Sequence, residues 1–201
     1  MKNNLVITIG RENGSGGKYI GERLAKELGV HCYDSSLLKK VADEFKDDIK
    51  NLKKSDEKLP KSHISFAGQK VPSKQFEEQA QIITELANRK SCIFIGRASN
   101  YILRNYSNVI NVFIHAPLDF RIKRYSKRKQ ISKKEAEKMI KQKDKERANF
   151  YKFYTNTNWG DSKNYNISID TSKVGIDGAI ELIKRCIELT GDYNINNELK
   201  K

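Results

Sequence analysis

Residues 10–21 read GRENGSGGKYIG, a stretch in which five glycines and Lys18 fall within twelve positions. The apolar run LVITI (5–9) precedes it, and the helical pattern of ERLAKELG (22–29) follows it. A short β-branched run that ends at glycine predicts a buried strand and then a turn. Strand, glycine-rich loop and helix, in this order, let backbone N–H groups and a helix N-terminus surround a phosphate. The stretch therefore predicts a phosphate-binding loop, with a purely structural glycine turn as the alternative.

The rest of the chain alternates between apolar runs and helical patterns. Further strands are predicted at VHCYD (30–34), SCIFIG (91–96), NVINVFIHA (108–116) and NISID (166–170). Helices are predicted over 37–49 and 73–89, after Pro117, after a capping box at Ser132 and Glu135, and over 174–189. Strands that alternate with helices predict an α/β fold with a parallel sheet and helices on both faces. Ligands of such sheets bind beyond the carboxyl ends of the strands.

Length and composition indicate one globular domain over about residues 1–190, followed by a polar tail at 191–201. No apolar run approaches the roughly 20 residues of a membrane span. The three cysteines are far apart and lack metal-ligand spacing, so we expect reduced thiols, no metal bound by protein side chains alone, and a cytoplasmic location. Composition leaves the oligomeric state open.

The formal charge of +14 attracts polyanions, and much of it lies in one region. Residues 118–152 carry 14 Lys and Arg against 5 Asp and Glu. This region predicts an anion-binding subdomain, with a solvated lysine-rich helix face as the alternative. Nucleic acid is a less favoured partner, because no recognisable nucleic-acid module accompanies the charge.

Taken together, GRENGSGGKYIG, YDSSLL (33–38), CIFIGRASNYIL (92–103), VFIHAPLDFRIKR (112–124) and DKERANFYKFYTNTNWGD (144–161) resemble the cytidylate kinase-like family. This family is a branch of the P-loop nucleoside monophosphate kinases. The resemblance implies a three-layer P-loop kinase fold with an acceptor-side helical insertion at about 45–75 and a basic lid at about 118–155. It also implies a nucleotide-dependent kinase that uses ATP and Mg²⁺ and phosphorylates a nucleoside monophosphate such as CMP.

The glycine loop departs from the family's usual pattern, in which a lysine and a Ser or Thr follow the glycines. When Gly14-Ser15-Gly16 is matched to the family's G-x-G, Gly17 stands where the phosphate lysine belongs. Lys18 then comes one residue late, and Tyr19 replaces the hydroxyl that helps to hold magnesium. We expect the donor phosphates to be held by Gly14, Ser15, Gly16, Gly17, Lys18 and Tyr19, with Lys18 reaching them as a flexible point charge.

Further site residues follow from the other matched motifs. Asp34 matches a carboxylate that organises metal or acceptor, with helix capping as the alternative, and Lys40 replaces an arginine that grips the acceptor phosphate. Arg97 follows an apolar strand and matches the arginine of a G-R-D motif, in which Ala98 replaces the carboxylate that reads cytosine. A surface ion pair is the alternative for Arg97.

The lid contributes four more candidates. Arg121 and Arg124 share a helix face, as do Asp144 and Arg147, which match the D-x-x-R that holds substrate phosphate and sugar in family lids. Arg124 is expected to act in catalysis, with Lys18 and Asp34; Arg121, Asp144 and Arg147 are expected to bind substrate. For the aromatic cluster at Tyr151, Tyr154 and Trp159, packing is favoured over stacking on a base. Two alternatives to the leading hypothesis are a non-catalytic protein that binds a nucleotide or polyanion and a kinase for a different small-molecule acceptor.

Overall fold

A computed structural model of the chain describes residues 3–37, 73–191 and 193–194. Its main sheet has five parallel strands in the order β3-β4-β2-β5-β6. The strands are β2 (Val6–Arg11), β3 (His31–Tyr33), β4 (Cys92–Ile95), β5 (Val109–His115) and β6 (Ile167–Asp170). All five coincide with apolar runs of the sequence, because strands covered on both faces lack polar alternation. The predicted parallel sheet is confirmed.

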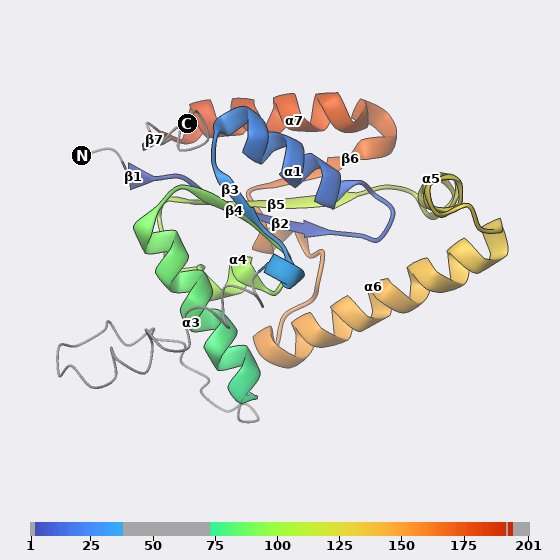
Figure 1. The fold of residues 1–201 in the computed structure, drawn as a ribbon, viewed down its shortest axis with the longest axis horizontal. Coiled ribbons are helices and arrows are strands. Elements are labelled where there is room, and N and C mark those ends of the chain that lie inside the picture. Colours follow the sequence, from blue (N-terminus) through green and yellow to red (C-terminus); the bar gives the residue numbers. More distant parts are fainter. Residues whose placement is uncertain (1–2, 38–72, 192, 195–201) are drawn as a thin grey trace.

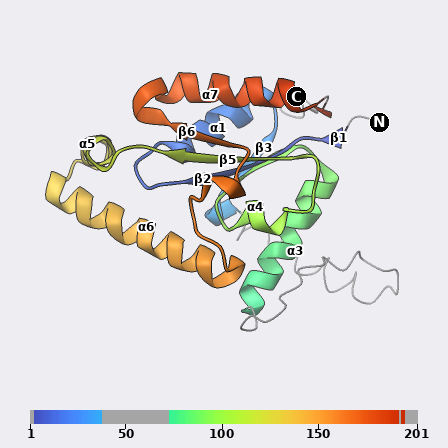
Figure 2. The ribbon, with the colours of Figure 1, turned by 180° about the vertical axis from the view of Figure 1, so that it is seen from behind.

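Helices cover both faces of this sheet (Figure 1, Figure 2). One face carries α1 (Gly17–Leu28) and α7 (Thr171–Thr190), and a core of side chains such as Ile20, Leu24 and Ile183 lies beneath them. The opposite face carries α3 (Lys74–Arg89) and the short α4 (Ser99–Ile102), over a second core that includes Phe94. The three-layer arrangement is therefore confirmed.

Two further helices extend beyond the carboxyl ends of the strands (Figure 1). They are α5 (Leu118–Lys129) and α6 (Lys133–Thr155), which contact each other and enclose a small core of their own around Tyr125 and Ile140. At the start of α6, the Ser132 hydroxyl accepts the backbone N–H of Glu135 at 3.1 Å, which is one of the two bonds of the predicted capping box. Near the other end of α6, Tyr151 packs into the second core, the one that includes Phe94.

The remaining elements are short. A single-turn 3₁₀ helix, η1 (Ser162–Asn164), precedes β6. A second, two-stranded parallel sheet pairs β1 (Asn3–Asn4), near the N-terminus, with β7 (Tyr193–Asn194), which lies in the polar tail. The helix predicted over 37–49, Lys40 and most of the 45–75 insertion fall outside the described residues. Within the described ranges, no helix combines the length and apolar character that crossing a membrane requires.

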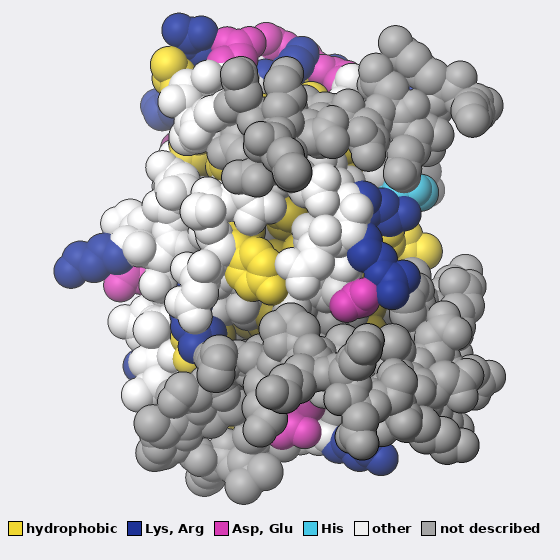
Figure 3. All heavy atoms as spheres, turned by 90° about the vertical axis from the view of Figure 1, so that its left-hand side faces the viewer, with side chains coloured by type: hydrophobic (Ala, Val, Ile, Leu, Met, Phe, Trp, Pro, Cys, Tyr) yellow, Lys and Arg dark blue, Asp and Glu magenta, His cyan; other side chains and the backbone are white. Residues whose placement is uncertain are grey.

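The surface that faces away from α5 shows Lys and Arg side chains at several separate places, with a small group of hydrophobic side chains between them (Figure 3). Asp and Glu side chains lie on the same surface, several of them beside the Lys and Arg side chains, so both signs of charge are present there (Figure 3). The carboxyl ends are where charged side chains gather into one cavity, described below.

Candidate active site

The loop between β2 and α1 has the geometry of an anion cradle. Gly14 (φ 85°) and Gly16 (φ 99°) adopt left-handed conformations that favour glycine, and Gly16 is the N-cap of α1. No side chain caps this helix at Gly16, so its first N–H groups point toward the loop. The Ser15 hydroxyl is directed inward and donates to the carbonyl of Glu12 at 2.9 Å. The cradle is therefore made of backbone groups.

Helices α5 and α6, which cover most of the region expected to be the lid, contact this loop directly. Arg121, which is buried, donates to Asp144 at 2.6 Å and to the Asn13 carbonyl at 3.1 Å. Its Nε also lies 3.2 Å from a carboxylate oxygen of Glu12. On the other side, Asp144 accepts the backbone N–H of Asn13 at 2.7 Å. Arg121 and Asp144 thus join the lid to the glycine loop, and neither lines the cavity described below.

Arg124 lies over the N-terminus of α1. A Cβ added at Gly16 would fall 2.7 Å from Arg124 Nη1, which places this guanidinium against the loop. Burial, together with the neighbouring Arg128, lowers the pKa of Arg124. A cation above a helix N-terminus is electrostatically unfavourable on its own and becomes favourable when an anion lies between the two. The Arg124 guanidinium therefore lies against the glycine loop with its charge facing the N-terminus of α1.

Lys18 and Asp34 form an ion pair beside the loop, with Lys18 Nζ 2.7 Å from Asp34 Oδ2. The other oxygen of Asp34 accepts the backbone N–H groups of Ser36 and Leu37 and the Ser36 hydroxyl. Burial alone would raise the pKa of Asp34, but the hydrogen bonds from Lys18, Ser36 and Leu37 hold it well below its usual range. The Asp34 bond also raises the pKa of Lys18. Asp34 therefore both caps the turn and stays ionised next to the loop.

The loop after β4 is strained. Gly96, Arg97 and Ala98 all adopt positive φ, at 75°, 62° and 53°. Each non-glycine residue in this region costs about 1–2 kcal/mol, and such strain collects at functional sites. The turn directs Arg97 along one wall of the cavity, where its guanidinium lies 6.0 Å from the ring centroid of Phe150.

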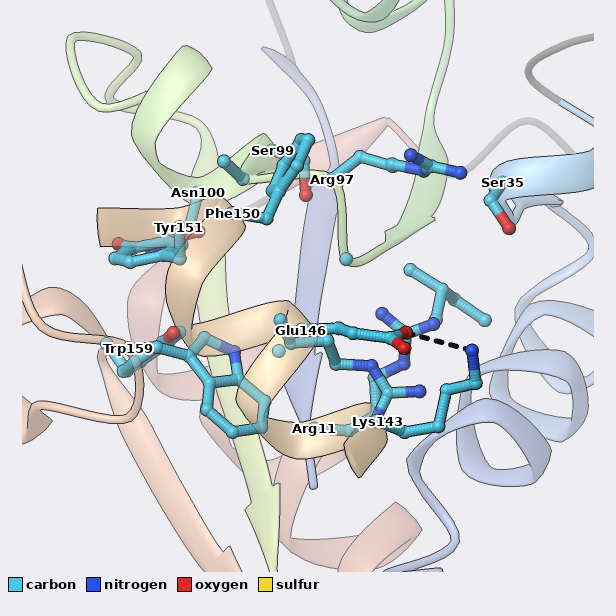
Figure 4. Close-up of a pocket in the computed structure, with 16 residues that line it drawn as sticks. Arg11, Ser35, Arg97, Ser99, Asn100, Lys143, Glu146, Phe150, Tyr151 and Trp159 are labelled. Carbon is cyan, nitrogen blue, oxygen red and sulfur yellow. Dashed lines mark hydrogen bonds and ion pairs between the residues drawn. The ribbon is translucent and has the colours of Figure 1, made fainter. Parts of the chain in front are cut away.

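A cavity of about 290 Å³ lies at the carboxyl ends of β2 and β4, beneath α6. Figure 4 shows a division along it, with Arg11, Arg97 and Lys143 toward one end and Tyr151 and Trp159 toward the other. The carboxylate of Glu146 lies at the end with the cations, where it is paired with Lys143 at 2.8 Å. Further lining residues include Ser35, Ser99, Asn100, Glu146, Arg147, Phe150 and Tyr165. The volume is near the lower end of the ~300–1,000 Å³ typical of small-molecule sites. The cavity suits a small ligand with one anionic end and one flat apolar end.

The aromatic residues divide between packing and lining. Tyr154 stacks on Phe76 with ring centroids 3.9 Å apart, so the prediction of packing is confirmed for Tyr154. Tyr151 is buried and binds Asn100 through its hydroxyl at 2.8 Å, yet one edge lines the cavity. Trp159 packs edge-on against Phe113 at 5.5 Å and also lines the cavity. Packing and ligand contact are therefore compatible for Tyr151 and Trp159.

The structure brings together two groups of predicted residues. Arg97 and Arg147 line the cavity, while the glycine loop, Lys18, Asp34 and Arg124 lie beside it. Tyr19 is half exposed on α1. Sequence reasoning overlooked Arg11, which ends β2, reaches into the cavity and lies beside Arg97 and Arg147. Its position directly after an apolar strand, like that of Arg97, was the available signal.

Comparison with known proteins places this geometry in context. A model of the cytidylate kinase-like family matches residues 6–173. A cytidylate kinase from Methanopyrus kandleri is 25% identical over 185 residues, which cover 92% of this chain and 93% of the relative. A crystal structure of an uncharacterised protein from Eubacterium ventriosum has a TM-score of 0.79 and 32% identity, covering 93% of this chain and 99% of that one. Shikimate kinase from Bacteroides thetaiotaomicron shares the fold, with a TM-score of 0.54, 14% identity and coverage of 92% and 98%.

Proposed function

Because the chain belongs to the cytidylate kinase-like family, we propose that it is a nucleotide-dependent kinase that transfers the γ-phosphoryl group of ATP to a nucleoside monophosphate. The single observation that carries this proposal is the cavity beside the glycine loop, with arginines at one end and aromatic rings at the other. A monophosphate would place its phosphate at Arg97 and Arg147 and its base at Trp159. Several relatives are named cytidylate kinase, so CMP is the first acceptor to test.

The residues present fit the phosphates of a nucleotide. Left-handed glycines let backbone N–H groups approach a phosphate closely, and Arg124 lies over the same loop. For magnesium, the described residues supply the carboxylate of Asp34 and no group of three ligands. This fits an ion that is carried mainly by the nucleotide, because Mg²⁺ is often bound through one or two carboxylates plus substrate phosphates. When bound, Mg²⁺ neutralises charge on the β- and γ-phosphates.

In the proposed reaction, an oxygen of the acceptor phosphate attacks the γ-phosphorus. The bond from that phosphorus to the β–γ bridging oxygen breaks, and ADP leaves with the electron pair. The acceptor phosphate is largely ionised at neutral pH, since its second pKa is near 6. No side chain is therefore required to remove a proton, and the chain's contribution is to position both phosphates and stabilise charge. Arg97, Arg124 and Arg147 are the groups we assign to this work, with Lys18 and Asp34 beside them.

Closure around the reactants comes from the lid. Helices α5 and α6 contact the glycine loop through Arg121 and Asp144. We propose that this contact keeps water from the bound phosphates. Exclusion of water protects the transferring group from hydrolysis and strengthens the electrostatic contacts. We propose that Arg121 and Asp144 hold this closed arrangement, and that Lys40, outside the described residues, contributes to acceptor binding.

The test is turnover with a panel of acceptors. Purified protein with ATP and Mg²⁺ should release ADP in the presence of at least one of CMP, dCMP, UMP, AMP or GMP. Arg97→Gln should raise the acceptor KM by about tenfold or more, because a charge-assisted hydrogen bond contributes about 1.5–3 kcal/mol. Arg185→Gln is the matched control, since Arg185 pairs with Glu188 on the surface of α7. If no acceptor in the panel leads to ADP release, the proposal of a nucleoside monophosphate kinase is overturned.

One observation favours a second candidate, a protein that binds a nucleotide without turning it over. Lys18, the cation expected to bind phosphate, is paired with Asp34, and Tyr19 stands where the usual pattern has Ser or Thr. Calorimetry separates the two candidates. Tight ATP binding without ADP release favours the binding protein, whereas turnover excludes it. A kinase for a different small-molecule acceptor would release ADP only with an acceptor outside the monophosphate panel.

A further inference from the structure

We propose that Arg11 supplies the phosphate-binding cation that the loop pattern G-x-x-x-x-G-K ordinarily places at position 17. When the second glycine of this pattern is Gly16, its first glycine falls at position 11 and its lysine at position 17. This chain has Arg11 and Gly17 there, so the basic residue and the glycine are exchanged between the two positions. The inference rests on the proposed function, because it assigns the cation of that same site.

The stem of Arg11 occupies the space that a side chain at position 17 would need. A Cβ built on Gly17 would lie 2.5 Å from Arg11 Cβ and 3.0 Å from its Cγ. Real Cβ atoms do not approach a neighbouring side chain this closely, so Arg11 and a lysine at position 17 exclude each other in this backbone. The aliphatic part of Arg11 therefore runs over the first residue of α1, where the usual lysine side chain begins.

The guanidinium reaches from the glycine loop to the loop after β4. A Cβ built on Gly96 would collide with Arg11 Nη1, and Gly96 itself has φ 75°. Arg11 thus passes between Gly17, which belongs to the expected donor loop, and Gly96, which precedes Arg97 of the expected acceptor site. A group transferred between donor and acceptor must lie between these two loops.

The Arg11 guanidinium forms no ion pair with a described carboxylate, although the charge of Asp34 attracts it and partly offsets the repulsion from Arg147 and Arg97. No hydrogen bond or ion pair joins its guanidinium to another described residue, although it lines the cavity at the cationic end. Burial, with the charges of Arg147 and Arg97, lowers the pKa of Arg11 to about 10, which still leaves it protonated at neutral pH. Arg11, Arg97 and Arg147 are partly buried, and partly buried cations that converge repel one another unless an anion lies between them. Lys18, in contrast, is half exposed and already paired with Asp34.

An arginine suits this position chemically. Its planar fork can donate to two oxygens of one phosphoryl group, or to one oxygen each of donor and acceptor phosphates. A group that contacts the transferring phosphoryl can contribute strongly to kcat, and an arginine that stabilises this charge is worth about 10³–10⁵-fold in related chemistry. Arg11 would therefore be a catalytic residue, and Gly17 and Gly96 are small because its side chain passes between them.

The decisive experiment compares Arg11→Gln, Lys18→Gln and the surface control Arg185→Gln, first by calorimetry with inorganic pyrophosphate and then by turnover. Pyrophosphate binding needs no acceptor, so it tests Arg11 even if every acceptor fails and the proposed function falls. We expect Arg11→Gln to weaken pyrophosphate binding by about 10- to 100-fold and to lower kcat by at least about 100-fold. Lys18→Gln should lose less in both measurements, and Arg185→Gln should match the wild type.

A double variant tests the exchange directly. Arg11→Gly with Gly17→Lys moves the cation back to position 17 and should bind pyrophosphate within about tenfold of the wild type, whereas Gly17→Lys alone should fold poorly because of the collision. Melting temperatures confirm that each protein measured is folded. If Arg11→Gln does not fold, the double variant decides, because a folded double variant without pyrophosphate binding overturns the inference. Wild-type affinity and kcat in folded Arg11→Gln, or a larger loss in Lys18→Gln, would also overturn it.

Discussion

The carboxylate of Asp144 in α6 accepts the backbone N–H of Asn13 in the glycine loop, with 2.7 Å between oxygen and nitrogen. The same carboxylate binds Arg121 at 2.6 Å and Arg147 at 3.2 Å. One side chain of α6 therefore joins the loop that is expected to hold donor phosphates to an arginine that lines the cavity. Through this link, the position of α6 and the conformation of the loop depend on each other.

We predict that Asp144→Ala lowers the free energy of unfolding by about 3 kcal/mol, because it leaves the buried Arg121 with one carboxylate fewer. Urea denaturation at neutral pH measures this loss. Asp177→Ala is the matched control, since Asp177 is an exposed partner of Arg23 and should change stability by less than about 1 kcal/mol. Equal effects of the two variants would show that the lid contact contributes no more than a surface pair.

The Asp34 carboxylate should make a pH-dependent contribution to stability. Its pKa in the folded protein lies below the ordinary value of 3.8, so its contribution is fully present above that value and is lost as pH falls below it. We predict that Asp34→Asn is less stable than the wild type by about 1–2 kcal/mol at pH 7. The difference should shrink when the same unfolding experiments are repeated near pH 3. A difference that stays constant with pH would show that the carboxylate charge is not the cause.

Gly96→Ala should displace Arg11, because the added methyl group would collide with the Arg11 guanidinium. Gly175→Ala is a sharp control, since Gly175 has a similar φ of 68° but no neighbouring atom within 4 Å of an added Cβ. Both variants should lose stability from backbone strain, about 1–3 kcal/mol each, because Gly175 with ψ −169° lies in a region that only glycine adopts readily. Pyrophosphate binding should weaken in Gly96→Ala alone, and an equal weakening in both would point to strain rather than to Arg11.

Trp159 is the single tryptophan of the chain and lines the cavity, so its fluorescence should report acceptor binding. We predict that an acceptor that supports turnover changes the emission in a saturable way. Trp159→Ala should raise the KM for that acceptor by about tenfold, because stacking on a base contributes about 1–3 kcal/mol. Phe153→Ala, which removes an exposed ring on α6, should leave KM unchanged. Turnover without any fluorescence change would place the base elsewhere.

Much of the fold could be predicted from short stretches of sequence. Apolar runs located the strands, the helical pattern of residues 22–29 located α1, and Ser132 with Glu135 located the start of α6. These features depend on residues within a few positions of one another, so local chemistry decides them. The glycine loop belongs to the same class, because left-handed backbone at Gly14 and Gly16 is a local requirement.

The candidate site could be predicted only in part. Arg97 and Arg147 were identified from their motifs, and both line the cavity. Lys18 was expected to reach the phosphates, and whether it does so remains a prediction, although the structure shows it bound to Asp34. Arg11 was overlooked, because nothing local indicates that its side chain turns across α1 toward Gly96.

The sequence by itself determined the order of strands and helices along the chain, the helix caps and the backbone conformation of the glycine loop. All of these depend on interactions between residues that are close in the sequence. Only the tertiary structure decided that Arg11 joins Arg97 and Arg147 at the cavity and that α5 and α6 contact the glycine loop. The Asn13–Asp144 bond joins residues 131 positions apart, and Arg11 meets Gly96 at the ends of two neighbouring strands, β2 and β4. Such contacts follow from how the elements pack, because a side chain's direction and its charge partners are settled only when distant segments meet.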